Sequence, residues 1–148
     1  MKLEVKHLAP YLPYELKLIY ETSNSIGGVI TPEVGIMKGI NHNQNKDYTV
    51  IMDTNLIWVF KPILRPISQI RAYFETIFES DQQVKEFLSY EATSPFSVDE
   101  IVDYKFQYLP YGTCQVLLKH HFDIFGLIDA DLAIDINKFE SKQHEQRL

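Results

Sequence analysis

The hydrophobic pattern of this chain changes its period at Pro66, and this change most constrains the fold. On the N-terminal side, β-branched and aromatic residues gather in four short segments that turn-forming residues separate. These segments are 16–20, 34–40, 48–52 and 56–60. On the C-terminal side, apolar residues recur at helical spacing, at Ile67, Ile70, Tyr73, Phe74, Ile77 and Phe78. The pattern predicts a run of strands followed by a run of helices.

The order of these segments predicts an α+β fold. The connections between the first four strands are short, which favours antiparallel neighbours because a parallel crossover needs about a dozen residues. A last short strand is predicted over 132–136. We therefore expect an antiparallel sheet of about four to five strands, an N-terminal meander, packed against a C-terminal helical layer. Residues 1–139 are expected to form a single domain and the polar residues 140–148 a frayed tail.

Prolines, glycines and one capping motif predict where the other helices begin and end. A short helix over 3–9 should end at Pro10, because the residue before a proline is pushed away from helical dihedral angles. Residues 97–100, Ser-Val-Asp-Glu, match a capping box and predict a short helix after them. A further helix should start at Pro110 and end near Gly126, a residue suited to a left-handed cap.

The composition indicates an ordinary globular protein. The chain has 148 residues, of which 45% are hydrophobic, and a net charge of −6 that argues against nucleic-acid binding. Cys114 is its only cysteine, so no internal disulfide can form and a reducing cytoplasm is the expected location. Cys114 lies too far along its helix from His121 for direct activation, so it is interpreted as core filling. No signal peptide, membrane span or cofactor is predicted.

The tetrapeptide Tyr-Leu-Pro-Tyr occurs twice and supplies the leading functional hypothesis. Its tyrosines are Tyr11 and Tyr14 in the first copy and Tyr108 and Tyr111 in the second. Tyrosine suits binding surfaces because it combines apolar area with a hydroxyl group at little entropic cost. The hypothesis is a non-enzymatic module that binds a protein partner through these tyrosines. The alternative is that they only rim the core. Self-association through an edge strand, giving a homodimer, stays open.

The segment His120-His121-Phe122-Asp123 supplies an enzymatic alternative. Imidazole and carboxylate groups are natural zinc ligands, and His120 and Asp123 share one helical face at i and i+3. A metal-dependent hydrolase would need further ligands from elsewhere in the chain, because these residues complete no recognised spacing. The candidates are His42, Asp129, Asp131 and Asp135. The competing interpretation places one histidine in the core and the other at a helix C-terminus.

Asp129, Asp131 and Asp135 are also similar to part of a calcium-binding loop. Counted from Asp129, Glu140 occupies the twelfth position, but Ile134 stands where the sixth-position glycine belongs. The segment after Asp131 alternates like a strand. The aspartates are therefore better interpreted as a turn that precedes it.

Lys61, Arg65 and Arg71 surround the start of the helix that begins at Ile67. A helix N-terminus with basic neighbours can hold a phosphate or a carboxylate group. This supplies a third hypothesis, phosphate or nucleic-acid binding. The competing interpretation is that the prolines here shape an exit from the sheet while the charges are simply solvated.

Three stretches of the chain carry a resemblance to a known group of proteins. They are Leu8-Ala9-Pro10-Tyr11-Leu12-Pro13-Tyr14, Lys61-Pro62-Ile63-Leu64-Arg65-Pro66-Ile67-Ser68, and His121-Phe122-Asp123-Ile124-Phe125-Gly126-Leu127-Ile128 with Leu132-Ala133-Ile134-Asp135-Ile136-Asn137. Together they resemble a family of small uncharacterised proteins from prophages and other mobile elements of gut bacteria. The resemblance implies a genomic setting but brings no known activity and no catalytic residues.

Overall fold

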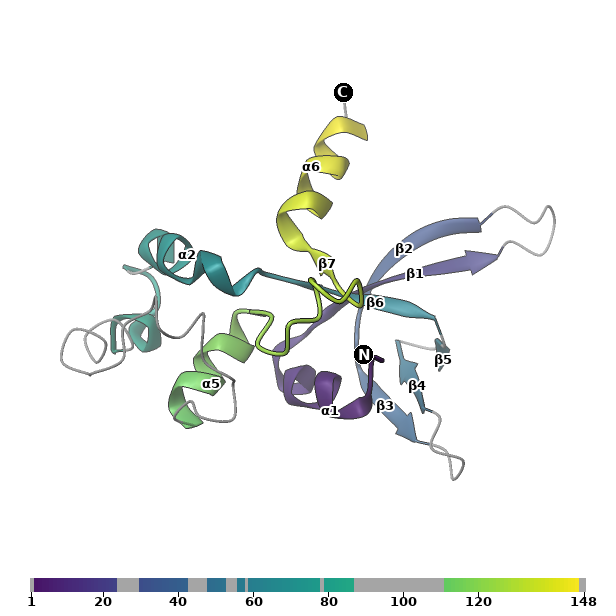
Figure 1. The fold of residues 1–148 in the computed structure, drawn as a ribbon, viewed down its shortest axis with the longest axis horizontal. Coiled ribbons are helices and arrows are strands. Elements are labelled where there is room, and N and C mark those ends of the chain that lie inside the picture. Colours follow the sequence, from purple (N-terminus) through teal and green to yellow (C-terminus); the bar gives the residue numbers. More distant parts are fainter. Residues whose placement is uncertain are drawn as a thin grey trace.

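The computed structural model describes residues 2–23, 30–42, 48–52, 56–57, 59–77, 79–86 and 111–146. The α+β class is confirmed, with strands mostly in the N-terminal half and helices mostly in the C-terminal half. Figure 1 shows the strands on one side of the molecule and helices α2 and α5 on the other. Among the described residues the strands form two sheets, not the single meander that the sequence predicts.

The larger sheet has the strand order β2-β1-β6-β7 within the described residues. Its strands are β1 (Lys17–Ser23), β2 (Ile30–Ile36), β6 (Phe60–Leu64) and β7 (Ile134–Asp135). Strand β1 is antiparallel to both β2 and β6, whereas β7 is parallel to β6. The expected purely antiparallel order fails at β7 because the whole helical part separates it from β6, which leaves ample chain for a parallel crossover.

The smaller sheet consists of β3 (Gly39–His42), β4 (Tyr48–Ile51) and β5 (Leu56–Ile57), all antiparallel. The segment predicted as one strand over 34–40 divides at Met37 and Lys38. The Met37 amide donates to the Leu16 carbonyl next to β1, while the Lys38 amide donates to the Ile51 carbonyl in β4. Consecutive amides thus bond to two different sheets, and the chain bends between them.

The N-terminal helix continues through its prolines. Helix α1 (Val5–Leu8) ends before Pro10, within the predicted bounds, but the 3₁₀ helix η1 (Ala9–Tyr14) follows it directly, which the sequence did not predict. Pro10 stands in the first turn of η1, where the missing amide hydrogen costs no helical hydrogen bond. Helix η1 ends at Glu15, which adopts the left-handed conformation with φ of 54°.

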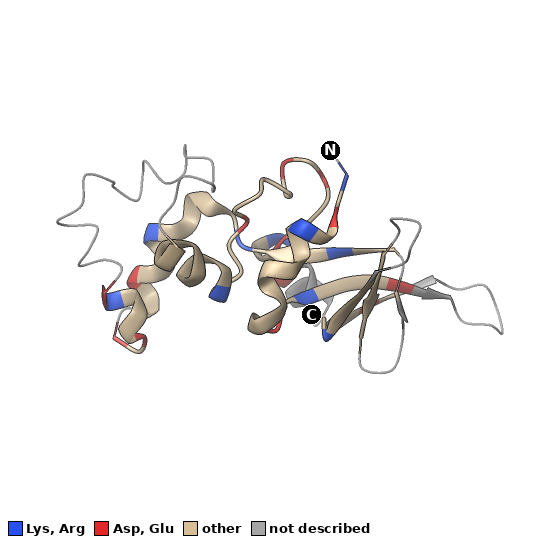
Figure 2. Ribbon diagram, turned by 90° about the horizontal axis from the view of Figure 1, so that it is seen from below, with Lys and Arg blue, Asp and Glu red and all other residues tan. Residues whose placement is uncertain are grey.

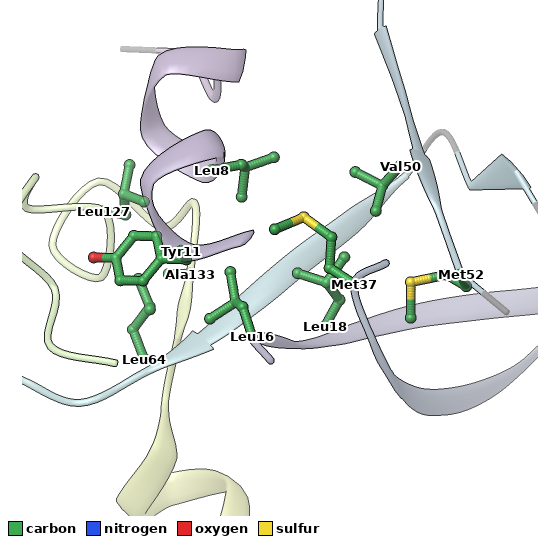
Figure 3. Close-up of a cluster of buried hydrophobic side chains, with 10 residues drawn as sticks. All are labelled: Leu8, Tyr11, Leu16, Leu18, Met37, Val50, Met52, Leu64, Leu127 and Ala133. Atoms are coloured by element: carbon green, nitrogen blue, oxygen red, sulfur yellow. The ribbon is translucent and has the colours of Figure 1, made fainter. Parts of the chain in front are cut away.

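Two clusters of buried apolar side chains form the interior. The first lies between the sheets, η1 and the loop before β7, and Figure 3 shows its members in contact around Leu16 and Leu18. They are Leu8, Tyr11, Leu16, Leu18, Met37, Val50, Met52, Leu64, Leu127 and Ala133. The second belongs to the helical part and comprises Ile70, Phe74, Val84, Leu117 and Phe122. We call these the sheet cluster and the helix cluster.

The helical part contains η2 (Ile67–Gln69), α2 (Ile70–Ile77), a helical segment over 82–86 and α5 (Tyr111–Lys119). The apolar stripe predicted after Pro66 is confirmed, because Ile70 and Phe74 are fully buried in the helix cluster. The predicted capping box at 97–100 lies outside the described residues.

The C-terminal residues form a helix. Only Ile134 and Asp135 of the predicted strand pair with β6, and helix α6 (Ile136–Gln146) follows at once. The Asp135 carboxylate accepts a hydrogen bond from the Asn137 amide, as a residue that caps a helix start does. Residues 140–146, expected to form a frayed tail, are therefore helical.

Helix α6 lies on the opposite side of the larger sheet from α1, as Figure 1 shows. It contacts β6 and β7 but leaves the sheet as it continues. No helix among the described residues is long and apolar enough to cross a membrane.

Candidate functional site

The end of α5 is shaped by the predicted metal-binding segment itself. His121 adopts the left-handed conformation with φ of 61°. Its amide donates to the Leu118 carbonyl at 3.0 Å, and the Phe122 amide donates to the Leu117 carbonyl at 3.0 Å. These two bonds form a Schellman motif, and Leu117 and Phe122 add its apolar contact in the helix cluster. The predicted end of this helix at Gly126 is therefore wrong, since a histidine supplies the left-handed cap.

The His121 side chain is used to join this helix end to η1. Its Nε2 atom lies within hydrogen-bond distance of the Tyr14 carbonyl oxygen. Burial lowers the pKa of His121, and the positive charges of Arg65 and Lys17 lower it further, against the opposing bond to Tyr14. The neutral imidazole with a hydrogen on Nε2 can donate this bond, so the ring is neutral and structural.

His120 points to a different partner. Its Nε2 atom lies 3.1 Å from Oδ2 of Asp81, and its ring packs edge-on against Tyr73 and Phe74. Burial lowers the pKa of His120, while Asp81 opposes this shift. The Asp81 carboxylate also accepts a 2.9 Å hydrogen bond from the Gln83 amide, where the helical segment 82–86 starts. His120 and Asp81 therefore connect two helices of the helix cluster.

Asp123 is buried and turned towards a third set of partners. Its two carboxylate oxygens accept hydrogen bonds of 2.8 Å from the amides of Leu127 and Ile128. Burial raises the pKa of Asp123, although the same two amides act to lower it. The carboxylate holds the turn that precedes β7.

His120, His121 and Asp123 thus face separate partners, and the described structure does not bring them together. Nowhere in the described ranges do three or more histidine, cysteine, aspartate or glutamate side chains gather as a metal site requires. Asp131 is engaged as well, because its Oδ1 atom lies 3.1 Å from Nζ of Lys61. Asp135 caps α6.

Cys114 does not form a nucleophilic site. Its side chain is partly buried, and burial raises the pKa of the thiol. A raised pKa leaves less of the reactive thiolate at neutral pH.

The predicted basic patch is divided by the fold. Lys61 forms an ion pair with Asp131, and the Arg65 guanidinium lies over the Tyr73 ring with 3.7 Å to its centroid. Arg71 is exposed on α2. Figure 2 shows basic and acidic residues interspersed along the described chain. Lys61 and Arg65 are therefore each engaged by a different partner.

The predicted tyrosine surface is reduced to a single well-exposed residue. Tyr11 is fully buried, and its hydroxyl donates a hydrogen bond to the Phe122 carbonyl, so its assignment to a binding surface is wrong. Its burial follows from η1, which turns Tyr11 into the sheet cluster. Tyr14 is partly buried, and Tyr108 lies outside the described residues. Tyr111, at the first position of α5, is 78% exposed.

One apolar surface escaped sequence reasoning. Leu16 and Leu18 point into the sheet cluster, so the alternation of β1 places Ile19 on the opposite face. The register sets Val34 directly beside Ile19, and Ile36 lies two residues along β2 on the same face. Val34 is 40% exposed, and Ile19 and Ile36 are partly exposed. We call Ile19, Val34 and Ile36 the outer face.

The sequence does contain a signal for this face. A strand with one solvated face alternates apolar and polar residues, and Ile19 stands at a position where that alternation predicts a polar side chain. On the neighbouring strand, Val34 and Ile36 alternate with Glu33 and Gly35, and the register places them beside Ile19 and Lys17.

Comparisons with known proteins give no match: no protein family, no curated protein and no solved structure is similar to this chain.

Proposed function

We propose that the protein is a non-enzymatic interaction module that binds a protein partner through the outer face. The observation that carries the proposal is the exposure of Val34 beside Ile19, on the side of β1 and β2 away from the sheet cluster. A contiguous exposed apolar surface is typical of an interaction site.

The charges around the outer face indicate the chemistry of the partner. Lys17 pairs in register with Ile36, and Lys61 with Ile19, so both lysines lie on the same face as the apolar residues. Lys17 is exposed, and among the described residues Lys61 pairs with the exposed Asp131. Exposed ion pairs of this kind are weak and easily exchanged. Exposed Glu21, paired with Pro32, also lies on this face, so we expect a partner that presents an apolar segment with acidic side chains placed at the lysines.

The alternative of a metal-dependent hydrolase loses its support. His120, His121 and Asp123 are the residues that the hydrolase would use, and each is held by a different part of the fold. Their bonds connect helices, η1 and the turn before β7. These residues therefore support the structure that carries the outer face.

The proposal extends to the setting of the protein. Encoding by a prophage or another mobile element is supported by the resemblance of the three sequence stretches alone. A reducing compartment such as the cytoplasm is supported by the single cysteine. Both statements belong to the proposal.

A matched pair of variants tests the proposed surface. Val34→Asp places a charge on the outer face, whereas Tyr111→Asp places the same charge on the exposed start of α5. Both side chains are exposed in the fold, so both variants should remain folded, as circular dichroism can verify. We expect Val34→Asp to lose the protein that co-purifies with the tagged wild type, and Tyr111→Asp to retain it. Loss with Tyr111→Asp alone would move the site to the tyrosine surface.

A further inference from the structure

A guanidinium group that has no acidic partner among the described residues lies where the sheet cluster meets the helix cluster, and we propose that it binds the oxyanion of a small molecule. The group belongs to Arg65, and the oxyanion is a phosphate or a carboxylate. We call this junction of β6, η2 and the end of α5 the waist. The proposal is independent of partner binding at the outer face.

The backbone of Arg65 is fixed from both sides. Its amide donates to the His121 carbonyl at 2.8 Å, and its carbonyl accepts from the Asp123 amide at 2.9 Å. The two bonds form a parallel bridge between Arg65 and Phe122. The base of the arginine side chain is thus held in place before any ligand arrives.

The guanidinium group is also oriented by aromatic rings. Its central carbon lies 3.7 Å from the centroid of the Tyr73 ring and 5.9 Å from that of Phe122. Stacking of this kind favours a positive charge over the ring face and leaves the edge of the planar group free to form hydrogen bonds. An oriented fork of donors is suited to bidentate binding of a phosphate or a carboxylate.

No described acidic side chain neutralises this group. The Nε atom of Arg65 is buried without a hydrogen-bond partner, and among the described residues no carboxylate forms an ion pair with Arg65. The two nearby aspartates are engaged elsewhere, Asp123 by the amides of Leu127 and Ile128 and Asp135 by Asn137. By contrast, four lysines in the described ranges form ion pairs with acidic side chains. They are Lys6, Lys61, Lys85 and Lys119.

The surroundings of Arg65 are positive. Burial has the largest effect on the pKa of His121, and the positive charges of Arg65 and Lys17 lower this pKa further, whereas the negative charge of Glu15 raises it. Arg65, Lys17 and His121 therefore lie within electrostatic reach of one another. An anion at the waist would therefore meet the positive charges of Arg65 and Lys17.

The ligand is expected to be small. Arg65 is partly exposed as a residue, whereas its Nε atom is buried. The net charge of −6 opposes the approach of a nucleic-acid backbone, whereas a small anion carries less charge to repel. Lys61, which the sequence grouped with Arg65, faces Asp131 in the described structure and is not included in this site.

Nuclear magnetic resonance can observe the group directly in the wild-type protein. The Nε–H resonance of Arg65 is followed while inorganic phosphate or acetate is added, with sodium chloride at matched ionic strength as the reference. We expect a saturable shift at Arg65 that chloride does not produce and that Arg71 does not share. A shift with phosphate identifies a phosphate ligand, and a shift with acetate identifies a carboxylate ligand. No shift with either anion, or the same shift with chloride, would overturn the proposal.

Two variants give a second readout that does not depend on the resonance. Arg65→Lys keeps the charge but loses the planar fork of donors. The melting temperature is measured as a function of anion concentration, and the apparent affinity for the anion obtained from it should be about tenfold lower in this variant. Lys38→Gln removes one exposed positive charge elsewhere and should respond like the wild type. Equal responses of the wild type and Arg65→Lys would count against the site.

Discussion

The hydroxyl of Tyr11 donates a hydrogen bond to the carbonyl oxygen of Phe122 and so joins the sheet cluster to the helix cluster. Both side chains are fully buried. The residues are 111 positions apart in sequence, and the bond lies at the waist beside Arg65 and His121. Residues that could have suggested chemistry are therefore concentrated where the two halves of the fold meet.

Tyr11→Phe should destabilise the protein without changing its packing. The variant keeps the ring but leaves the buried Phe122 carbonyl without this donor, which costs about 1–2 kcal/mol. Urea unfolding measures the loss. Tyr14→Phe is the control, because the Tyr14 hydroxyl forms no hydrogen bond within the described residues. Equal stability of the two variants would show that the Tyr11 bond does not hold the clusters together.

His121→Ala and His121→Gly separate two roles of one residue. Both variants lose the side-chain bond to Tyr14, but only alanine pays for the left-handed conformation at φ of 61°. The glycine variant should therefore be more stable than the alanine variant by about 1 kcal/mol. Thermal or urea unfolding gives the difference. A more stable alanine variant would contradict the Schellman motif at the end of α5.

The stability of the protein should fall as the pH falls through the ordinary pKa of histidine, about 6.5. Burial lowers the folded-state pKa values of His7, His120 and His121, so the unfolded chain binds more protons in this range. Stability is then complete above the unfolded pKa and decreases towards the lower folded values. Urea unfolding between pH 8 and pH 5 should show the decrease.

His121→Asn tests the contribution of one histidine to this pH dependence. Asparagine tolerates the left-handed conformation but does not titrate. The difference in unfolding free energy between the wild type and this variant should shrink as the pH falls. A constant difference would mean that His121 has the same pKa in the folded and unfolded states.

Pro32→Thr should promote self-association through β2. The Met37 amide donates to the Leu16 carbonyl, so these two residues form a hydrogen-bonded pair of the antiparallel ladder. Such pairs alternate with non-hydrogen-bonded pairs along the strands, and the register places Pro32 and Val34 in non-hydrogen-bonded pairs. Their backbone groups therefore point away from β1. Pro32 has no amide hydrogen to offer at this edge, which protects it from pairing with another strand. Sedimentation analysis should show more dimer for Pro32→Thr than for the control Val34→Thr, which adds no donor. Equal behaviour would remove this role from Pro32.

Patterns along the chain predicted the helices and strands better than they predicted which strands pair with one another. The stripe that includes Ile70 and Phe74 identified α2 and its buried side, because helical periodicity depends only on neighbours along the chain. The division of one predicted strand at Met37 and Lys38 arises from bonds to Leu16 and Ile51, which no local pattern encodes.

The candidate sites failed for a related reason. Histidine and aspartate side chains such as those of His120, His121 and Asp123 are compatible with metal binding. In the fold, however, they bond to Asp81, to Tyr14 and to the turn before β7, and these bonds stabilise the structure. Tyr11 shows the same limit, because burial of its ring depends on how η1 packs. The outer face does have a sequence signal, because the apolar residue Ile19 stands where the alternation of β1 predicts a polar one.

Site-specific photo-crosslinking tests the central claim, binding of a partner at the outer face, most directly. A photoreactive amino acid replaces Val34 in one protein and the exposed Lys38 in another, and both are irradiated in cells. We predict a discrete crosslinked protein from position 34 that is absent from position 38 and disappears when Ile19→Asp is added. No crosslink at position 34, or the same products at both positions, would contradict the account.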